Sequence, residues 1–254
     1  MNPILVITDI LIITKRNLMR YLRIPQLVIF SSIQPVMFVL LFAFVFGGAI
    51  NTPGTDYINY LIPGIIVQTV IFGAMQTGVG LADDLTKGMI DRFRSLPMAR
   101  SAVLAGRTLS DTIRNVFVVL LMTGVGYAIG FRFQGNFLEA LAALGLAVLF
   151  GFAFSWISAS IGLMIKEVET VQVAGFIWVF PLVFASSIFV PVESMPSWLE
   201  AFAKYSPITV TVNAVRAFAL GFDPGNNVIQ SLAWMVGILV IFVPLAIHQY
   251  RKGS

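Results

Sequence analysis

The sequence contains no cysteine and a single histidine, His248. The lack of cysteine excludes a disulfide framework and thiolate metal sites, and one histidine leaves little scope for a zinc site or a Ser-His-Asp triad. Charge is also scarce, because only 11% of the 254 residues are Asp, Glu, Lys or Arg, whereas soluble domains carry roughly 25%. With 58% hydrophobic residues and a mean hydropathy of +0.91, the composition is that of an integral membrane protein.

The sequence also lacks the motifs and buried charges of several functional classes. The P-loop pattern GxxxxGK[ST] does not occur, so any energy from nucleotide has to come through another chain. Carboxylates and lysines are missing from the long apolar stretches, although ion-coupled carriers generally use such groups for proton or sodium relay. An ion-coupled carrier or channel acting alone, and a scaffold without transport activity, stay open as alternatives. No catalytic, cofactor or metal site and no nucleic-acid partner is predicted for this chain.

Long apolar stretches dominate what is present. A helical span needs about 20 apolar residues, and the continuous apolarity of these stretches argues against a membrane β-barrel. We therefore predict an all-α integral membrane protein with a single membrane domain, 1–254, and six transmembrane helices. The stretches without ionisable residues are 24–55, 57–82, 115–131, 140–165, 170–192 and 224–247. The predicted spans are about 26–48, 60–82, 112–131, 138–165, 171–190 and 228–248.

Basic residues lie mainly on one side of the predicted spans. Of the 16 Lys and Arg residues, only Arg132, Lys204 and Arg216 fall on the other side. Because basic residues concentrate on the cytoplasmic side of membrane proteins, both termini are predicted to be cytoplasmic. The first apolar run, 4–13, is too short to span and precedes several basic residues, so 1–23 is expected to form an interfacial amphipathic helix. No cleavable signal peptide is recognised.

A polar segment with a helical pattern joins spans two and three. Residues 83–96 are predicted to form a helix that starts at two aspartates and stops at Pro97. Its apolar side chains repeat at i, i+4, i+8 and i+11, which places them on one face. Such a helix either lies on the membrane surface or docks into a groove of a cytoplasmic partner. The apolar face consists of Leu85, Met89, Phe93 and Leu96, and the charged positions include Asp84, Lys87, Asp91 and Arg92.

A second and much shorter connection on the same side joins spans four and five. It reads IKEVET and contains the charged residues Lys166, Glu167 and Glu169. This composition is typical of a solvated turn, which is what the residues alone predict.

Residues 189–209 read FVPVESMPSWLEAFAKYSPIT, which is too polar to cross a bilayer easily and too apolar for an ordinary soluble loop. The pattern predicts two short helices, the second opening at Pro207 and ending before Gly221. The pair is expected to dip into the outer leaflet, with an amphipathic loop on the surface as the alternative. One helix carries the aromatic face Trp198, Phe202 and Tyr205, and the other the polar stripe Thr209, Asn213 and Arg216.

Two stretches together resemble a known family. DLTKGMIDRFRSLPMARSAVLAGRTLSD and SSIFVPVESMPSWLEAFAKYSPITVTVNAVRAFALG are similar to the permease subunit of ABC-2 type exporters, particularly the daunorubicin and doxorubicin resistance permeases of actinobacteria. The resemblance implies two permease copies, expected as a homodimer, and two copies of a separate ATPase subunit that holds ATP and Mg. It implies a coupling helix at 83–96 with a second contact at IKEVET, and an external re-entrant hairpin at 193–220.

The resemblance also sets the expected function. It implies a permease of the bacterial plasma membrane that exports a hydrophobic or amphiphilic substrate, drug-like or lipid, from the cytoplasm or the inner leaflet. A lipid-linked glycan or polysaccharide is the alternative within the same family. The hairpin is expected to form an external gate with Trp198, Phe202, Tyr205, Asn213 and Arg216, whereas no substrate-contacting residue can be carried over.

Overall fold

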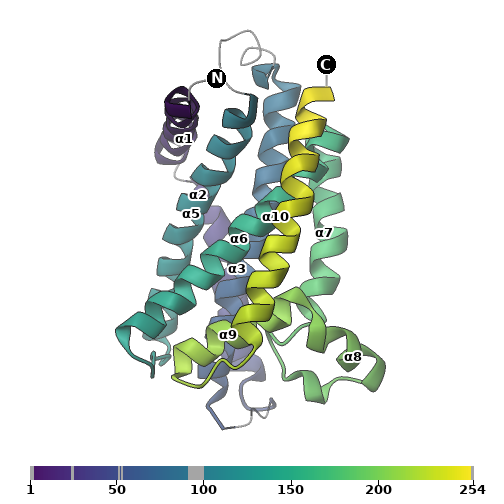
Figure 1. Cartoon of the computed structure of the whole chain (residues 1–254). Coiled ribbons are helices and arrows are strands. Elements are labelled where there is room, and N and C mark those ends of the chain that lie inside the picture. Colours follow the sequence, from purple (N-terminus) through teal and green to yellow (C-terminus); the bar gives the residue numbers. More distant parts are fainter. Residues whose placement is uncertain (1–2, 24–25, 51, 53, 91–99, 253–254) are drawn as a thin grey trace.

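The computed structural model describes residues 3–23, 26–50, 52, 54–90 and 100–252, and within these ranges it consists of helices and their connections (Figure 1). The helices run roughly side by side except α1, α8 and α9, which lie near the two ends of the bundle. In chain order they are α1 (Pro3–Arg23), α2 (Gln26–Leu40), the π-helical η1 (Leu41–Phe46), α3 (Tyr57–Thr86), α5 (Arg100–Ala128), α6 (Phe137–Ile165), α7 (Val168–Phe184), the short η2 (Val192–Ser194), α8 (Ser197–Tyr205), α9 (Pro207–Leu220) and α10 (Asn227–Lys252).

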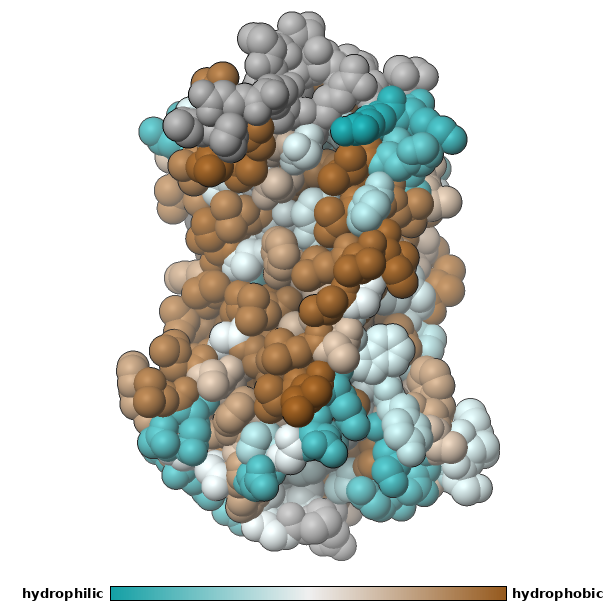
Figure 2. Space-filling view, viewed as in Figure 1, coloured by the Kyte–Doolittle hydropathy of each residue, from teal (hydrophilic) through white to brown (hydrophobic). Residues whose placement is uncertain are grey.

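Among the described residues, α3, α5, α6 and α10 are long and apolar enough to cross a membrane. Apolar residues cover the middle of the molecule and hydrophilic residues gather toward its ends (Figure 2), as expected for a protein whose middle faces lipid. The chain is therefore a multi-pass integral membrane protein. The 17 residues of α7 extend only about 25 Å at 1.5 Å per residue, and α2 is also short, so the six-span topology stays a prediction.

Helix α3 occupies the centre and packs in parallel along α6. Glycines bring the two backbones close together, because a Cβ atom added at Gly162 would lie 2.3 Å from the Gly78 carbonyl oxygen, and one at Gly78 would lie 2.3 Å from that of Ser158. Earlier along both helices, Gly151 meets Val70 in the same way. Small residues thus allow close helix packing, as they commonly do in membranes.

The structure corrects one predicted boundary before the segment 91–99. Helix α3 continues to Thr86, so a helix that starts at Asp83 is wrong, and the two aspartates lie in the last turn of α3. Gly88, with φ +66°, interrupts the helix at a position that favours glycine. Helix α5 includes Arg100–Ala128, so the helix extends beyond the predicted span 112–131 toward the N-terminus, and the span itself stays a prediction.

The opposite end of the bundle contains the predicted pair of short helices, α8 and α9. Pro207 is the first residue of α9, and the Ser206 hydroxyl accepts a hydrogen bond from the Ile208 amide. Gly221 ends the helix in the left-handed conformation, with φ +69°, so the predicted start and stop of α9 are confirmed. Helix α9 is largely buried against α6, α10 and α3, whereas α8 projects to the side (Figure 1).

Candidate functional site

A cluster of buried charges ties α1, α3 and α5 together at the end of the bundle that carries α1. Arg107 of α5 forms ion pairs with Asp84 of α3 at 3.4 Å and with Asp111, one turn along α5, at 3.3 Å. Arg16 of α1 lies 3.4 Å from the same oxygen of Asp84. Gly80 makes room for this arrangement, because a Cβ atom there would overlap the Arg107 guanidinium.

Asp111 is the most deeply buried charged member, with 1% of its surface exposed. The Tyr21 hydroxyl of α1 donates to its Oδ1 atom, and the Thr77 hydroxyl of α3 donates to its Oδ2 atom at 2.7 Å. Burial, and next the charge of Asp111, raise the pKa of Tyr21 to about 12, so this hydroxyl stays protonated and remains a donor at neutral pH. We call Arg16, Tyr21, Thr77, Asp84, Arg107 and Asp111 the ion cluster.

Helix α1 approaches α5 closely beside the ion cluster. The Thr14 hydroxyl donates to the Gly106 carbonyl at 3.2 Å, and a Cβ atom at Gly106 would lie 2.7 Å from Ile13. A hydrogen bond and backbone proximity therefore add to the ion pairs, and α1 is fixed to the bundle instead of resting only against lipid.

The predicted coupling residues fall into three groups in the structure. Asp84 is buried in the ion cluster, so its carboxylate is not exposed to a partner. Lys87 is exposed and pairs with Asp83 at 2.7 Å, while Leu85 and Met89 are half-buried. The remaining predicted positions, Asp91, Arg92, Phe93 and Leu96, lie outside the described residues.

The IKEVET connection is an exposed, tight turn, as predicted. Lys166 ends α6 with φ +62°, and α7 begins two residues later at Val168. Lys166, Glu167 and Glu169 are all exposed, and the Thr170 hydroxyl donates to Glu167. Since α3 and α6 run in parallel, the structure brings this turn to the same end of the bundle as Lys87 and the ion cluster.

A second polar cluster lies near the opposite end, around Arg216 of α9. The buried guanidinium donates from Nε to the Tyr60 carbonyl at 3.0 Å, from Nη2 to the Ser187 carbonyl at 2.7 Å and from Nη1 to Asn213 Oδ1 at 2.9 Å. Its Cζ atom lies 3.5 Å from the centre of the Tyr60 ring. Thr209 accepts from the Ser187 amide at 3.1 Å, so the whole predicted stripe meets at one place.

These hydrogen bonds satisfy the irregular backbone that follows α7. The Tyr60 hydroxyl donates to the Ser187 carbonyl at 3.1 Å, and the Tyr57 hydroxyl donates to the Phe189 carbonyl at 3.0 Å. Non-helical backbone at membrane depth needs such partners because lipid offers none. The structure therefore separates the predicted gate residues: Asn213 and Arg216 are part of an internal tie, while Trp198, Phe202 and Tyr205 are exposed together on α8.

Aromatic side chains of α2, η1, α3 and α7 form a continuous row that the sequence analysis missed. The closest pair joins Phe42 of η1 to Phe189 at 4.2 Å between ring centres, and Phe184 lies 5.2 Å from the same ring. The spacing i, i+4, i+8 occurs in both helical segments and is the signal that could have revealed the row. Its members are Phe38, Phe42, Phe46, Phe72, Phe176, Phe180, Phe184 and Phe189.

The ion cluster was missed for a related reason. Arg107 and Asp111 are four residues apart, the spacing of a helical ion pair, but charges in this segment were assigned to a polar connection on one side of the membrane. Helix α5 carries them into the protein interior instead.

Comparisons with known proteins agree with this architecture. The model of the ABC-2 type transporter family matches residues 8–220. The daunorubicin resistance ABC transporter permease protein DrrB1 of Streptomyces coeruleorubidus is 35% identical over 94% of this chain and 84% of its own. The probable doxorubicin resistance ABC transporter permease protein DrrC of Mycobacterium tuberculosis is 28% identical over 98% and 91%, and the inner membrane transport permease YadH of Escherichia coli is 23% identical over 84% and 82%. The chain belongs to the ABC-2 type transporter family.

Proposed function

We propose that the chain is the permease subunit of an ATP-driven exporter in the bacterial plasma membrane, with the α1 end and both termini in the cytoplasm. Its cargo is a hydrophobic or amphiphilic molecule, drug-like or lipid, taken from the cytoplasm or the inner leaflet. Two relatives named as daunorubicin and doxorubicin resistance ABC permeases support this function. We assign ATP and Mg to two copies of a separate ATPase subunit, which is consistent with the lack of a P-loop pattern in this sequence.

The ion cluster is the observation that carries the proposal. It joins α1, α3 and α5 beside the segment that begins at Lys87, which we assign to ATPase coupling together with the exposed turn at Lys166. Because breaking a buried ion pair is costly, a force applied to this segment moves the three helices together. A force from the ATPase therefore reaches the membrane as a joint movement of these three helices.

The aromatic row supplies a chemically suitable path for the cargo. It extends from α7 to α2 and η1, and its members Phe46 and Phe184 are exposed, as is Phe44 of η1. An apolar surface of this kind fits a second copy of the chain, so we propose a homodimer whose facing aromatic rows contact the substrate. The exposed aromatic face of α8 then lies at the outer mouth as the gate.

Co-purification with the partner ATPase tests the proposal. The Phe93→Asp substitution places a charge on the apolar face assigned to the ATPase groove, and we expect the co-purified ATPase and its permease-dependent ATP turnover to fall roughly tenfold or more. Phe222→Asp is the matched control, since Phe222 is exposed at the other end of the bundle, and should leave both unchanged. A folded Phe93→Asp variant that couples normally would remove the coupling assignment, and cargo movement without any ATPase would instead indicate an ion-coupled carrier or channel.

A further inference from the structure

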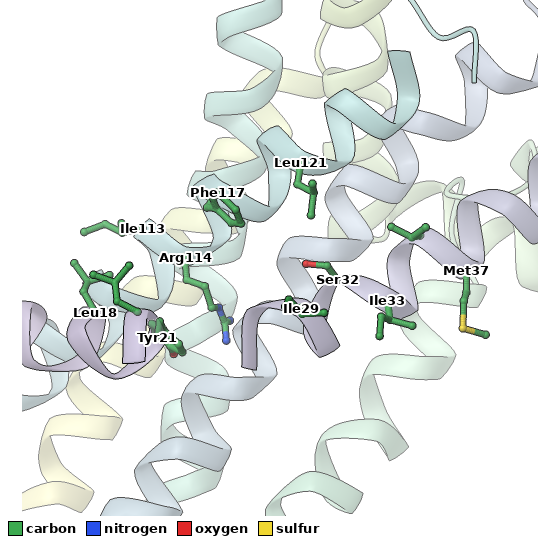
Figure 3. Close-up of a pocket in the computed structure, with 12 residues that line it drawn as sticks. Leu18, Tyr21, Ile29, Ser32, Ile33, Met37, Ile113, Arg114, Phe117 and Leu121 are labelled. Carbon is green, nitrogen blue, oxygen red and sulfur yellow. The ribbon is translucent and has the colours of Figure 1, made fainter. Parts of the chain in front are cut away.

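A large apolar pocket opens between α1, α2 and α5, away from the aromatic row. Its volume is about 830 Å³, which is within the range of pockets that bind drug-sized ligands. The apolar walls come from Leu18 and Leu22 of α1, Ile33 and Val36 of α2, and Phe117 and Leu121 of α5. Figure 3 shows these three helices surrounding the space, with the α1 and α2 residues on adjoining sides of it.

One charged group lines this pocket. Arg114 projects from α5 into the space between Tyr21 of α1 and Ile29 of α2 (Figure 3). Only 7% of Arg114 is exposed, and its guanidinium carbon lies 5.4 Å from the centre of the Tyr21 ring. The pocket therefore combines extended hydrocarbon walls with a single buried cation.

The charge of Arg114 is not balanced by an ion pair among the described residues. Its Nη2 atom donates to two uncharged acceptors, the Gly73 carbonyl at 2.7 Å and Asn115 Oδ1 at 3.2 Å, and its buried Nε atom has no hydrogen-bond partner in the described part of the chain. The nearby carboxylate of Asp111 already accepts from Tyr21, Thr77 and Arg107. A buried cation with an unused donor is costly, and an anion in the pocket would offset that cost.

Two other buried arginines, Arg107 and Arg216, do not share this arrangement. Arg107 has two carboxylate partners, and all three nitrogen atoms of the Arg216 guanidinium donate to oxygen atoms. Both guanidinium groups have partners within the protein and need no ligand, and neither lines the pocket. Nonspecific contact between acyl chains and an apolar surface does not explain why a buried guanidinium with an unbonded donor lies at this position.

The apolar walls and the cation are placed as an amphiphilic lipid requires, with the cation toward the membrane surface on which α1 lies. Arg114 lies one turn beyond Asp111, to which α1 is bonded, so the cation is close to the level of α1. The walls at Met37, Phe117 and Leu121 continue from there along α2 and α5, away from α1. A head group would meet Arg114 beside α1, and an acyl chain would extend between α2 and α5.

We propose that this pocket binds one anionic phospholipid of the surrounding membrane, with its phosphate on Arg114 and an acyl chain against α2 and α5. The lipid is a bound component that holds α1 and α2 against α5, and it is distinct from the exported cargo. The site does not depend on the ATPase or on the assignment of the aromatic row.

Lipid binding to the full-length chain tests this site. The purified, delipidated protein is titrated with dioleoylphosphatidylglycerol or dioleoylphosphatidylcholine, which share acyl chains and differ in net charge, and bound lipid is counted by native mass spectrometry. We expect one phosphatidylglycerol per chain, bound about tenfold more tightly than phosphatidylcholine. Both lipids present a phosphate to Arg114, but the choline cation cancels the net negative charge that would offset the buried guanidinium. Arg114→Gln should abolish the difference, whereas Arg23→Gln, which removes an exposed charge of α1, should preserve it.

A second variant keeps the test valid if Arg114→Gln does not fold. Ile33→Trp fills the pocket from its exposed wall and leaves Arg114 in place, so it should displace the lipid while the protein stays monodisperse. Three results would each overturn the proposal. Folded Arg114→Gln could still prefer phosphatidylglycerol, Ile33→Trp could bind lipid as before, or the unaltered chain could bind the two lipids equally. Displacement of phosphatidylglycerol by equimolar oleate would also overturn it, in favour of a free fatty acid.

Discussion

Three buried arginines show how the chain handles charge at membrane depth. Arg107 pairs with carboxylates, Arg216 donates to backbone carbonyls and an amide oxygen, and Arg114 retains an unbonded donor. Arginine stays charged in each setting, so the surrounding residues determine whether the charge fixes helices together or attracts a ligand. The first two arginines fix helices at the two ends of the bundle, and the third lines an open pocket.

Asp111 is the residue whose charge matters most for stability. In Asp111→Asn, Arg107 keeps only Asp84 as a carboxylate partner, and the buried positive charge is left partly uncompensated. We expect the free energy of unfolding to fall by about 3–5 kcal/mol, measured by denaturant titration in detergent micelles. Asp83→Asn is the control, because the pairs that Asp83 forms with Arg20 and Lys87 in the described part of the chain are exposed. This substitution should cost about 1 kcal/mol or less. Equal losses in the two variants would show that the ion cluster does not hold the helices.

At the scale of helices, the sequence predicted the ends of individual helices better than the contacts between helices. The caps of α9 were readable because Pro207 and Gly221 act through their own backbone geometry. The extent of α5 was not readable, since Arg107 and Asp111 look solvated until α1 and α3 supply partners. Phe176, Phe180 and Phe184 repeat at helical spacing, but a lipid-facing helix carries the same pattern, so the contacts of α7 with α2 and α3 needed the structure.

The contact between α3 and α6 gives a prediction about glycine. In Gly162→Ala the new Cβ atom would lie 2.3 Å from the Gly78 carbonyl oxygen, so the two helices have to separate. We expect a loss of about 1–3 kcal/mol in the free energy of unfolding, the usual cost of overpacking. Gly124→Ala is the matched control, since the space around Gly124 is open and alanine favours a helix by about 1 kcal/mol. The idea of close packing at Gly162 fails if both variants are equally stable.

At the scale of the whole molecule, the two ends of the helix bundle differ in the residues that they carry. The end with α1 carries the ion cluster, the exposed turn at Lys166 and the basic last turn of α10. The other end carries α8, with exposed aromatic residues suited to a membrane interface. This asymmetry agrees with the distribution of Lys and Arg along the sequence, on which the proposed cytoplasmic position of the α1 end is based.

Cysteine labelling of intact cells tests that orientation directly, because the chain has no cysteine of its own. Ser197→Cys lies at the start of α8 and Lys252→Cys at the end of α10, and both positions are exposed. A membrane-impermeant thiol reagent should label Ser197→Cys from outside, and should reach Lys252→Cys only after lysis. The reverse result would invert the molecule and place the ion cluster away from any cytoplasmic ATPase. Labelling of both positions from outside would mean that the two ends do not lie on opposite sides of the membrane, which the length of α10 argues against, since its 26 residues extend about 39 Å.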